Sequence, residues 1–183
     1  MGDPRRLRKK VVGPRHPFDK ERLEQELPLM GIYGLRNKQE IRRALTNLRR
    51  FRSRSRRMLA LPPQQRAEQE SILIKKLYSL ALVPENATLD SVLTLSVEDF
   101  LNRRLQTVVH EKGLAYTPHQ ARQMIVHGHI AIKGRRVTVP GYHVPRDEED
   151  LIDYSVDSSF RDKNHIIHQD RREVVSKEEI TGE

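Results

Sequence analysis

Residues 101–144 read LNRRLQTVVHEKGLAYTPHQARQMIVHGHIAIKGRRVTVPGYHV. Gly113 and Gly128 each follow a short stretch whose apolar residues recur at helical spacing, and glycine commonly ends a helix. Apolar and polar residues then alternate in HIAIK and RVTV on either side of Gly134, a pattern typical of a two-stranded hairpin. We therefore predict two short amphipathic helices followed by an antiparallel hairpin.

The second of these helices separates an apolar side from a polar side. Thr117 is a good N-cap residue, and Pro118 suits the first helical turn. At about 100° per residue, the apolar side carries Ala121, Met124 and Ile125, and the polar side carries His119, Arg122, Gln123 and His127. A guanidinium, an amide and two imidazoles suit phosphates, bases and ribose hydroxyls. We therefore predict that this polar side binds RNA.

Cations on either side of this helix extend the predicted surface. In the first helix, the predicted core side contains Leu101, Leu105, Val108 and Val109, and the predicted solvent side contains Arg103, Gln106 and His110. The cations predicted to bind RNA are Arg103, Arg104, Lys133, Arg135 and Arg136. The alternative interpretation is a solvated surface, which the scarcity of nearby acidic residues disfavours.

Charge is sorted into blocks along the chain, whose net charge is +9. Residues 1–57 contain 18 basic and 6 acidic side chains, and residues 101–146 contain 8 and 1. In contrast, residues 58–100 contain 3 and 6, and residues 147–183 contain 5 and 12. A charge that served only solubility would be interspersed, so the blocks indicate two basic contact surfaces for a polyanion.

The upstream half begins with helical patterns. A short helix is predicted over residues 19–27, and GIYG at residues 31–34 is predicted to turn the chain. Asn37 and Glu40 have the spacing of a capping box, in which each side chain binds the other residue's backbone N–H. They predict the start of a longer helix that runs to about Leu59.

Further elements follow two adjacent prolines. A third helix is predicted over residues 64–82, with an apolar side that can pack on the preceding helix, and residues 89–95 are predicted to form a short apolar turn. Ser96 and Asp99 have the spacing of a second capping box. We place the start of the next domain there, with the boundary near residue 95.

The end of the longer helix is rich in arginine. Its cations are Arg49, Arg50, Arg52, Arg54, Arg56 and Arg57, which at helical spacing surround the axis. Like charges at i,i+4 spacing destabilise an isolated helix, so this segment needs counter-charge from outside, and phosphates on more than one side would supply it. A disordered, phosphorylated arginine-serine tract is the alternative, which the capped helix leading into it disfavours.

These elements predict an α+β chain. We expect an extended basic arm at residues 1–18, a basic helical domain at 19–95, and an acidic tail with little regular structure at 157–183. Residues 96–156 are expected to form an RNA-binding domain of two helices and a small antiparallel sheet, which includes a strand over residues 151–156.

Two parts of this chain resemble known sequences. TPHQARQMIVHGHI at residues 117–130, followed by GRRVTVPGY at 134–142, closely resembles the S-four-type RNA-binding domain. PRHPFDKERLEQELPLMGIYGLRNKQEIRRAL at residues 14–45 resembles the N-terminal half of the small-subunit ribosomal protein four family, in its archaeal and eukaryotic form. The resemblance covers roughly residues 11–155, and archaeal origin fits the short chain better. This chain departs from the family at Lys133, a position where the family often has asparagine.

The resemblance implies a structural protein of the small ribosomal subunit that binds ribosomal RNA early in assembly and stabilises a helix junction. It also implies a place in the cytoplasm near the side of the subunit where messenger RNA enters, support of translational accuracy, and contact with the fifth small-subunit protein. The alternatives are a free-standing RNA chaperone and an RNA-modifying enzyme, since pseudouridine synthases and a tyrosyl-transfer-RNA synthetase use the same domain as an accessory. The enzyme alternative is disfavoured, because such enzymes need a large catalytic domain and the residues outside the RNA-binding domain are predicted to form only a basic helical domain, an arm and a tail.

Other functions find little support in the residues. The chain has no cysteine, which excludes disulfides and thiolate zinc sites, and no apolar run approaches the length of a membrane span. The pairs His127-x-His129 and His165-x-x-His168 lack further metal ligands, and DEED at residues 147–150 is more simply a solvated turn or a contact for a basic protein. We expect no catalytic residue, no metal and no cofactor.

Overall fold

The structure, a computed structural model, describes residues 11–162 and 165, so most of the predicted arm and tail lie outside the described residues. The chain forms two compact units, Met1–Arg103 and Arg104–Glu183. The first unit is helical and the second combines short helices with a three-stranded antiparallel sheet, which confirms the predicted α+β class. Each unit has its own hydrophobic core.

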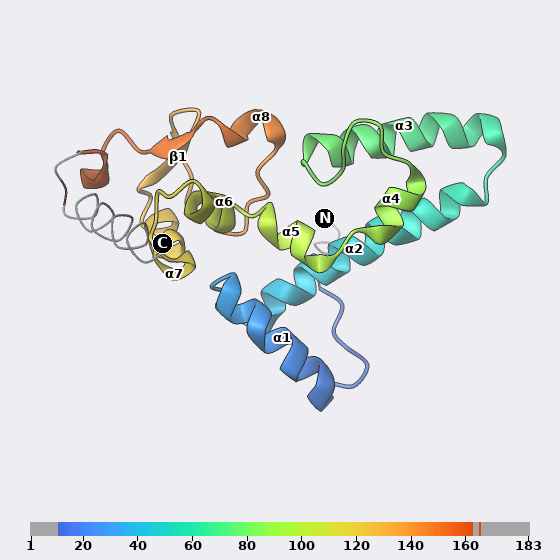
Figure 1. The fold of residues 1–183 in the computed structure, drawn as a ribbon, viewed down its shortest axis with the longest axis horizontal. Coiled ribbons are helices and arrows are strands. Elements are labelled where there is room, and N and C mark those ends of the chain that lie inside the picture. The colour runs from blue at the N-terminus through green and yellow to red at the C-terminus, as the bar shows by residue number, and fades with distance from the viewer. Residues whose placement is uncertain (1–10, 163–164, 166–183) are drawn as a thin grey trace, which may run out of the picture. The chain divides into compact units, whose positions relative to one another are not determined.

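The first unit is organised around its longest helix, α2 (Lys38–Leu59), which the other helices of the unit contact (Figure 1). These helices are α1 (Lys20–Ile32), α3 (Pro63–Ser79), α4 (Leu89–Thr94) and α5 (Val97–Asn102). One side of α2 is buried, with Ile41, Leu48 and Met58 at most 5% exposed. Even Ser55 is fully buried on this side, where its hydroxyl donates to the Leu89 carbonyl at 3.4 Å.

Two helical segments of this unit differ from the prediction. The first helix extends to Ile32 instead of residue 27, because Leu29 and Met30 pack on the core and outweigh the backbone donor that Pro28 lacks. Residues 89–94 form a helix instead of the predicted turn, because Leu89 and Val92 are buried together against α2.

Helix α5 belongs to the first unit, which places the division between the units after Arg103 instead of near residue 95. Phe100 and Leu101 are both buried in the core of the first unit, and the Phe100 ring stacks on Phe51 with 5.8 Å between centroids. The sequence predicted one continuous first helix with Leu101 in the core of the RNA-binding domain. The chain instead leaves the helical conformation at Arg104 before the next helix begins.

Only one of the two predicted capping boxes forms. Ser96 Oγ accepts from the Asp99 backbone N–H, and the Asp99 carboxylate accepts from the Ser96 N–H at 2.7 Å. Asn37 is the N-cap residue of α2 as predicted, but its side chain makes no capping hydrogen bond. The predicted end of this helix near Leu59 is confirmed.

The second unit follows the predicted order of helix, helix and hairpin. Its elements are α6 (Leu105–Glu111), α7 (Pro118–Val126), β1 (Ile130–Ile132), β2 (Arg135–Arg136), α8 (Arg146–Glu149), β3 (Ile152–Tyr154) and a 3₁₀ turn, η1 (Ser159–Arg161). The strand order is β2-β1-β3, with both neighbours antiparallel to β1. The predicted apolar side of α7, Ala121, Met124 and Ile125, is buried as expected. Predicted capping by Thr117 is confirmed, since its hydroxyl accepts from the Gln120 N–H.

The hairpin turn contains two residues with left-handed backbone. Ile132 pairs with Arg135, which leaves Lys133 (φ 52°) and Gly134 (φ 74°) as the loop. Positive φ at both central residues is what a type I′ turn requires, and this turn matches the twist of the two strands. Lys133 therefore occupies a conformation that is more favourable for asparagine or glycine, and the fold tolerates this cost at the tip.

Gly128 is required for two reasons. It ends α7 with a φ of +78°, and a Cβ at this position would lie 2.6 Å from Arg136 Cδ. The missing side chain thus allows both the left-handed turn and the close approach of Arg136. Gly128 therefore allows the Arg136 side chain of β2 to pack against the end of α7.

We predict that Gly128→Ala lowers the free energy of unfolding by about 1–2 kcal/mol from backbone strain alone, with a further cost from the clash with Arg136. Urea denaturation of the full chain measures this. Gly141→Ala is the control in the same unit, since its Cβ would meet only Arg104 Nη2 at 3.5 Å, an ordinary contact. Equal destabilisation by both substitutions would contradict the assignment.

Candidate RNA-binding surfaces

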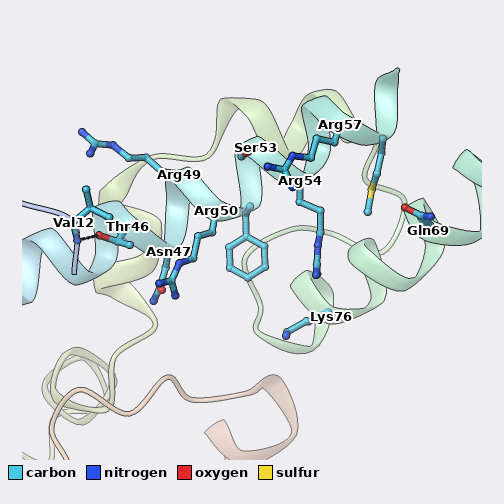
Figure 2. A pocket seen from close by; sticks show the side chains of 12 residues that line it. Val12, Thr46, Asn47, Arg49, Arg50, Ser53, Arg54, Arg57, Gln69 and Lys76 are labelled. Carbon is cyan, nitrogen blue, oxygen red and sulfur yellow. Dashed lines mark hydrogen bonds between the residues drawn. The ribbon is translucent and has the colours of Figure 1, made fainter. Parts of the chain in front are cut away.

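A cation-lined groove runs along α2 and is closed on one side by α3 (Figure 2). Its charged residues are Arg49, Arg50, Arg54, Arg57 and Lys76, and its other polar residues are Thr46, Asn47, Ser53 and Gln69. Phe51, Met58 and Val12 complete the lining. In Figure 2, Arg50 and Arg54 extend from α2 in one direction and Arg49 extends in another. We call this feature the α2 groove.

The charge of the α2 groove is uncompensated among the described residues. No acidic side chain lines it, and none of its five cations forms an ion pair with another described residue. All four of its arginines are exposed. Because the cations repel one another at short range, a polyanion in the groove would relieve this repulsion.

The predicted ring of arginines around α2 is only partly formed. Arg52 lies at the edge of the buried side, is half-buried, and its Nη2 donates to the Leu95 carbonyl at 2.5 Å. It therefore supports the packing of the first unit and does not line the α2 groove, and its contact with RNA stays a prediction. Arg56 is exposed but does not line the groove.

The segment before the groove also lies against α2. The Val12 N–H donates to Thr46 Oγ1 at 3.2 Å, and this hydroxyl donates to the Arg42 carbonyl at 2.6 Å. Val12 belongs to the predicted arm at residues 1–18, so the described end of that segment leads to the groove. Residues 1–10, with most of the arm's cations, lie outside the described residues.

The second candidate surface is the polar side of α7. His119, Gln123 and His127 are exposed there, and Arg122 is half-buried. Arg122 Nη1 donates to Gln106 Oε1 at 3.2 Å, and Gln106 Nε2 donates to the Pro118 carbonyl at 2.9 Å. We call this side, together with the hairpin cations Lys133, Arg135 and Arg136, the cassette face.

Gln106 was predicted on the solvent side of the first helix and Arg104 was predicted to contact RNA, but both are buried. Gln106 is 1% exposed because its amide joins α6 to the start of α7 and holds Arg122. Arg104 is 6% exposed and forms an antiparallel bridge with His143. Since Leu105 and Gln106 also donate backbone hydrogen bonds to the Tyr142 and Pro140 carbonyls, residues 140–143 cover this site. Arg104 is therefore removed from the candidate RNA contacts. Arg103 is only half-buried and remains a candidate.

Acidic residues of the C-terminal block contact two of the three hairpin cations. Lys133 Nζ lies 3.4 Å from Glu148 Oε1, and Arg136 Nη2 lies 3.0 Å from Asp157 Oδ2. Arg135 has no ion-pair partner among the described residues. The DEED segment at residues 147–150, predicted as a solvated turn, lies mostly in the short helix α8. Its Glu148 also accepts a hydrogen bond from the Tyr142 hydroxyl at 2.7 Å.

Residues that follow β3 cover His129 behind the cassette face. Its Nδ1 shares a hydrogen bond with Ser158 Oγ at 3.0 Å, and the Phe160 ring packs edge-on against it with 4.5 Å between centroids. Burial lowers the pKa of His129 below its ordinary value, and the nearby His127 and Arg136 lower this pKa further. The neutral form of His129 is therefore favoured, and it adds no charge to the surface.

Two further pKa shifts lie near the hairpin. The hydrogen bond to Glu148 raises the pKa of Tyr142, so its hydroxyl stays protonated. Burial and, secondarily, Arg104 lower the pKa of His143. In both cases the shift stabilises the neutral side chain within the segment that covers α6.

Sequence reasoning missed the part of the α2 groove that α3 provides. Gln69 and Lys76 are seven residues apart and therefore lie on one side of α3, but their segment has a net negative charge and a predicted apolar packing side. Only the helix packing shows that this side faces the arginines. The spacing of Gln69 and Lys76 was the available signal.

Within the described ranges, no group of three or more His, Asp or Glu side chains has an arrangement that would hold a metal ion. The rings of His127 and His129 lie 6.5 Å apart between centroids. His168 is outside the described residues. No described helix combines the length and the apolar character needed to cross a membrane.

Comparison with known proteins identifies the family. The S4 domain family matches residues 103–150, which lie almost entirely in the second unit. The chain is 60% identical over 160 residues to small ribosomal subunit protein uS4 of Ignicoccus hospitalis, a match that covers 87% of this chain and 96% of the relative.

Two other relatives carry the same name. The uS4 protein of Hyperthermus butylicus is 57% identical over 160 residues, covering 87% of this chain and 91% of the relative. That of Sulfurisphaera tokodaii is 56% identical over 178 residues, covering 97% and 99%. These relatives are archaeal, as the short chain predicted. The chain belongs to the uS4 family of small ribosomal subunit proteins.

Proposed function

We propose that this protein is a structural, non-enzymatic constituent of the small ribosomal subunit that binds ribosomal RNA through the α2 groove and the cassette face. The observation that carries the proposal is the α2 groove, whose five lining cations have no acidic neighbour in the described lining. Such a surface favours a polyanion, and its arginines can bind phosphates in bidentate geometry.

Each surface has a different role in this proposal. The α2 groove supplies uncompensated charge for the RNA backbone, whereas the α7 side of the cassette face adds an amide and imidazoles suited to bases and ribose hydroxyls. The proposed contacts on this face are His119, Arg122, Gln123, His127, Lys133, Arg135 and Arg136. Arg103, at the end of the first unit, is a further proposed contact. Recognition therefore depends on RNA shape and backbone more than on sequence.

Two surfaces on one chain also support a role early in assembly. Once one surface is bound, binding of the second becomes intramolecular and gains from a high effective concentration. A protein that holds two RNA elements in this way stabilises the junction between them before other proteins arrive. The family resemblance adds the finer expectations: a cytoplasmic subunit, the side where messenger RNA enters, contact with the fifth small-subunit protein, and support of translational accuracy.

Sedimentation of the native protein tests this assignment against a free-standing RNA chaperone. We expect the protein to co-migrate quantitatively with small ribosomal subunits. A soluble pool without a subunit peak would refute the ribosomal role. Conversion of uridine to pseudouridine by the purified chain would instead favour the RNA-modifying alternative.

Neighbouring lysines on α3 provide a matched test of the α2 groove. Lys76 lines the groove, whereas Lys75 is exposed on another side of the helix. We predict that Lys76→Gln weakens binding to small-subunit ribosomal RNA and reduces the log-log salt slope by about 0.7–0.9, the value of one lost phosphate contact. Filter binding across a salt series measures both quantities.

Lys75→Gln removes the same charge and is expected to leave the salt slope unchanged. If both variants weaken RNA binding and reduce the salt slope equally, the change reflects the total charge of the chain, and the groove is not the binding surface.

Removal of an acidic contact at the hairpin is predicted to strengthen RNA binding. Asp157→Asn removes the carboxylate beside Arg136, so it should tighten RNA binding by about two- to fivefold at low salt, the range of an exposed ion pair. Asp153→Asn is the control, because it makes the same substitution at an exposed residue that contacts no hairpin cation among the described residues. Equal tightening by both would contradict a specific role for Asp157.

A further inference from the structure

A second hollow lies on α3, with a lining unlike that of the α2 groove. Ala67, Ser71, Ile74 and Tyr78 line it and recur at helical spacing. The charged residues of its lining are Glu70, Lys75 and Glu85. Ile74 and Tyr78 are only half-buried by the described chain, so apolar surface remains accessible there. We call this feature the α3 hollow.

The α3 hollow and the α2 groove lie on opposite sides of one helix. At 100° per residue, Gln69 and Lys76 fall roughly 180° from Ala67 and Ile74 around the α3 axis. A ligand in the α3 hollow is thus separated by the helix from RNA in the α2 groove. Val12 lies on the groove side, because its N–H binds Thr46 there.

The charge of the α3 hollow disfavours nucleic acid. Glu70 is paired with Arg66 at 3.5 Å, but Glu85 is exposed and has no ion-pair partner among the described residues. The lining contains a single cation, Lys75, so the hollow offers one charged contact to an RNA backbone where the α2 groove offers five. Glu85 can instead pair with a lysine or arginine of a protein.

We propose that the α3 hollow binds a basic, amphipathic segment of a neighbouring protein of the small subunit. Aliphatic side chains of that segment pack on Ile74 and Tyr78, and a lysine or arginine pairs with Glu85. This inference rests on the proposed function, since it requires the chain to be held in the subunit by RNA on the opposite side of α3. One helix then separates an RNA contact from a protein contact.

Site-specific photocrosslinking in assembled small subunits tests the inference. The full chain carries p-benzoylphenylalanine at Ser71, which lines the α3 hollow, or at Gln69, which lines the α2 groove; both positions are exposed. We expect the probe at Ser71 to react with a peptide of another small-subunit protein in which Lys and Arg outnumber Asp and Glu. The probe at Gln69 is expected to react with ribosomal RNA.

Charge reversal provides the second measurement. Glu85→Lys is expected to reduce the Ser71 crosslink to that protein by about fivefold, because a pair is replaced by repulsion. Glu68→Lys makes the same change on an exposed residue that does not line the hollow, and it should leave the yield unchanged. Equal loss in both variants overturns the pairing with Glu85.

The outcomes separate the inference from the proposed function. If Gln69 reacts with RNA while Ser71 reacts with RNA, with this chain itself, with a second copy or with nothing, the inference is wrong and the proposed function stands. If neither variant enters small subunits, the proposed function fails, and the inference fails with it.

Discussion

Burial of one side of α2 is the constraint on which the first unit depends. Helices α1, α3, α4 and α5 contact α2, and its buried side excludes water from residues as different as Ile41 and Ser55. This packing supplies stability that the sequence of α2 alone does not, because a run of arginines at helical spacing opposes helix formation. Tertiary contacts thus hold the arginines in a helix before any polyanion binds, so the α2 groove is preformed.

Polar residues build the second unit to an extent that the sequence did not predict. Thr117, Met124 and the glycines could be assigned from capping rules and helical spacing, and the structure confirms them. The burial of Gln106 and Arg104 could not be assigned in this way, since neither a polar residue on the predicted solvent side nor a predicted RNA-binding cation gives a sign that another segment covers it. That segment, residues 140–143, returns to α6 after the hairpin, and this is a non-local contact. The same reason explains Phe100 and Leu101, whose partners lie on the distant helix α2.

The candidate site was predicted best where local geometry sufficed. His119, Gln123 and His127 are exposed on one side of α7 because the spacing of their apolar neighbours determines the buried side. The arginine segment was predicted less well, because counting charges around an isolated axis ignored the side that packs. Arg52 lies where that side begins, so its guanidinium binds a carbonyl. Lys76 and Gln69 could be assigned to the groove only from the packing of α3.

The two candidate surfaces differ in what RNA must displace. The cations of the α2 groove have no described acidic partner, so RNA contacts there replace only water and ions, and counterion release contributes fully. At the hairpin, Lys133 and Arg136 already contact Glu148 and Asp157, and RNA must compete with these carboxylates. Nonspecific polyanions are therefore favoured at the groove more than at the hairpin. Under the proposed function, discrimination among RNAs depends on the cassette face, where an RNA must make enough contacts with α7 to outweigh the loss of the Lys133–Glu148 and Arg136–Asp157 ion pairs.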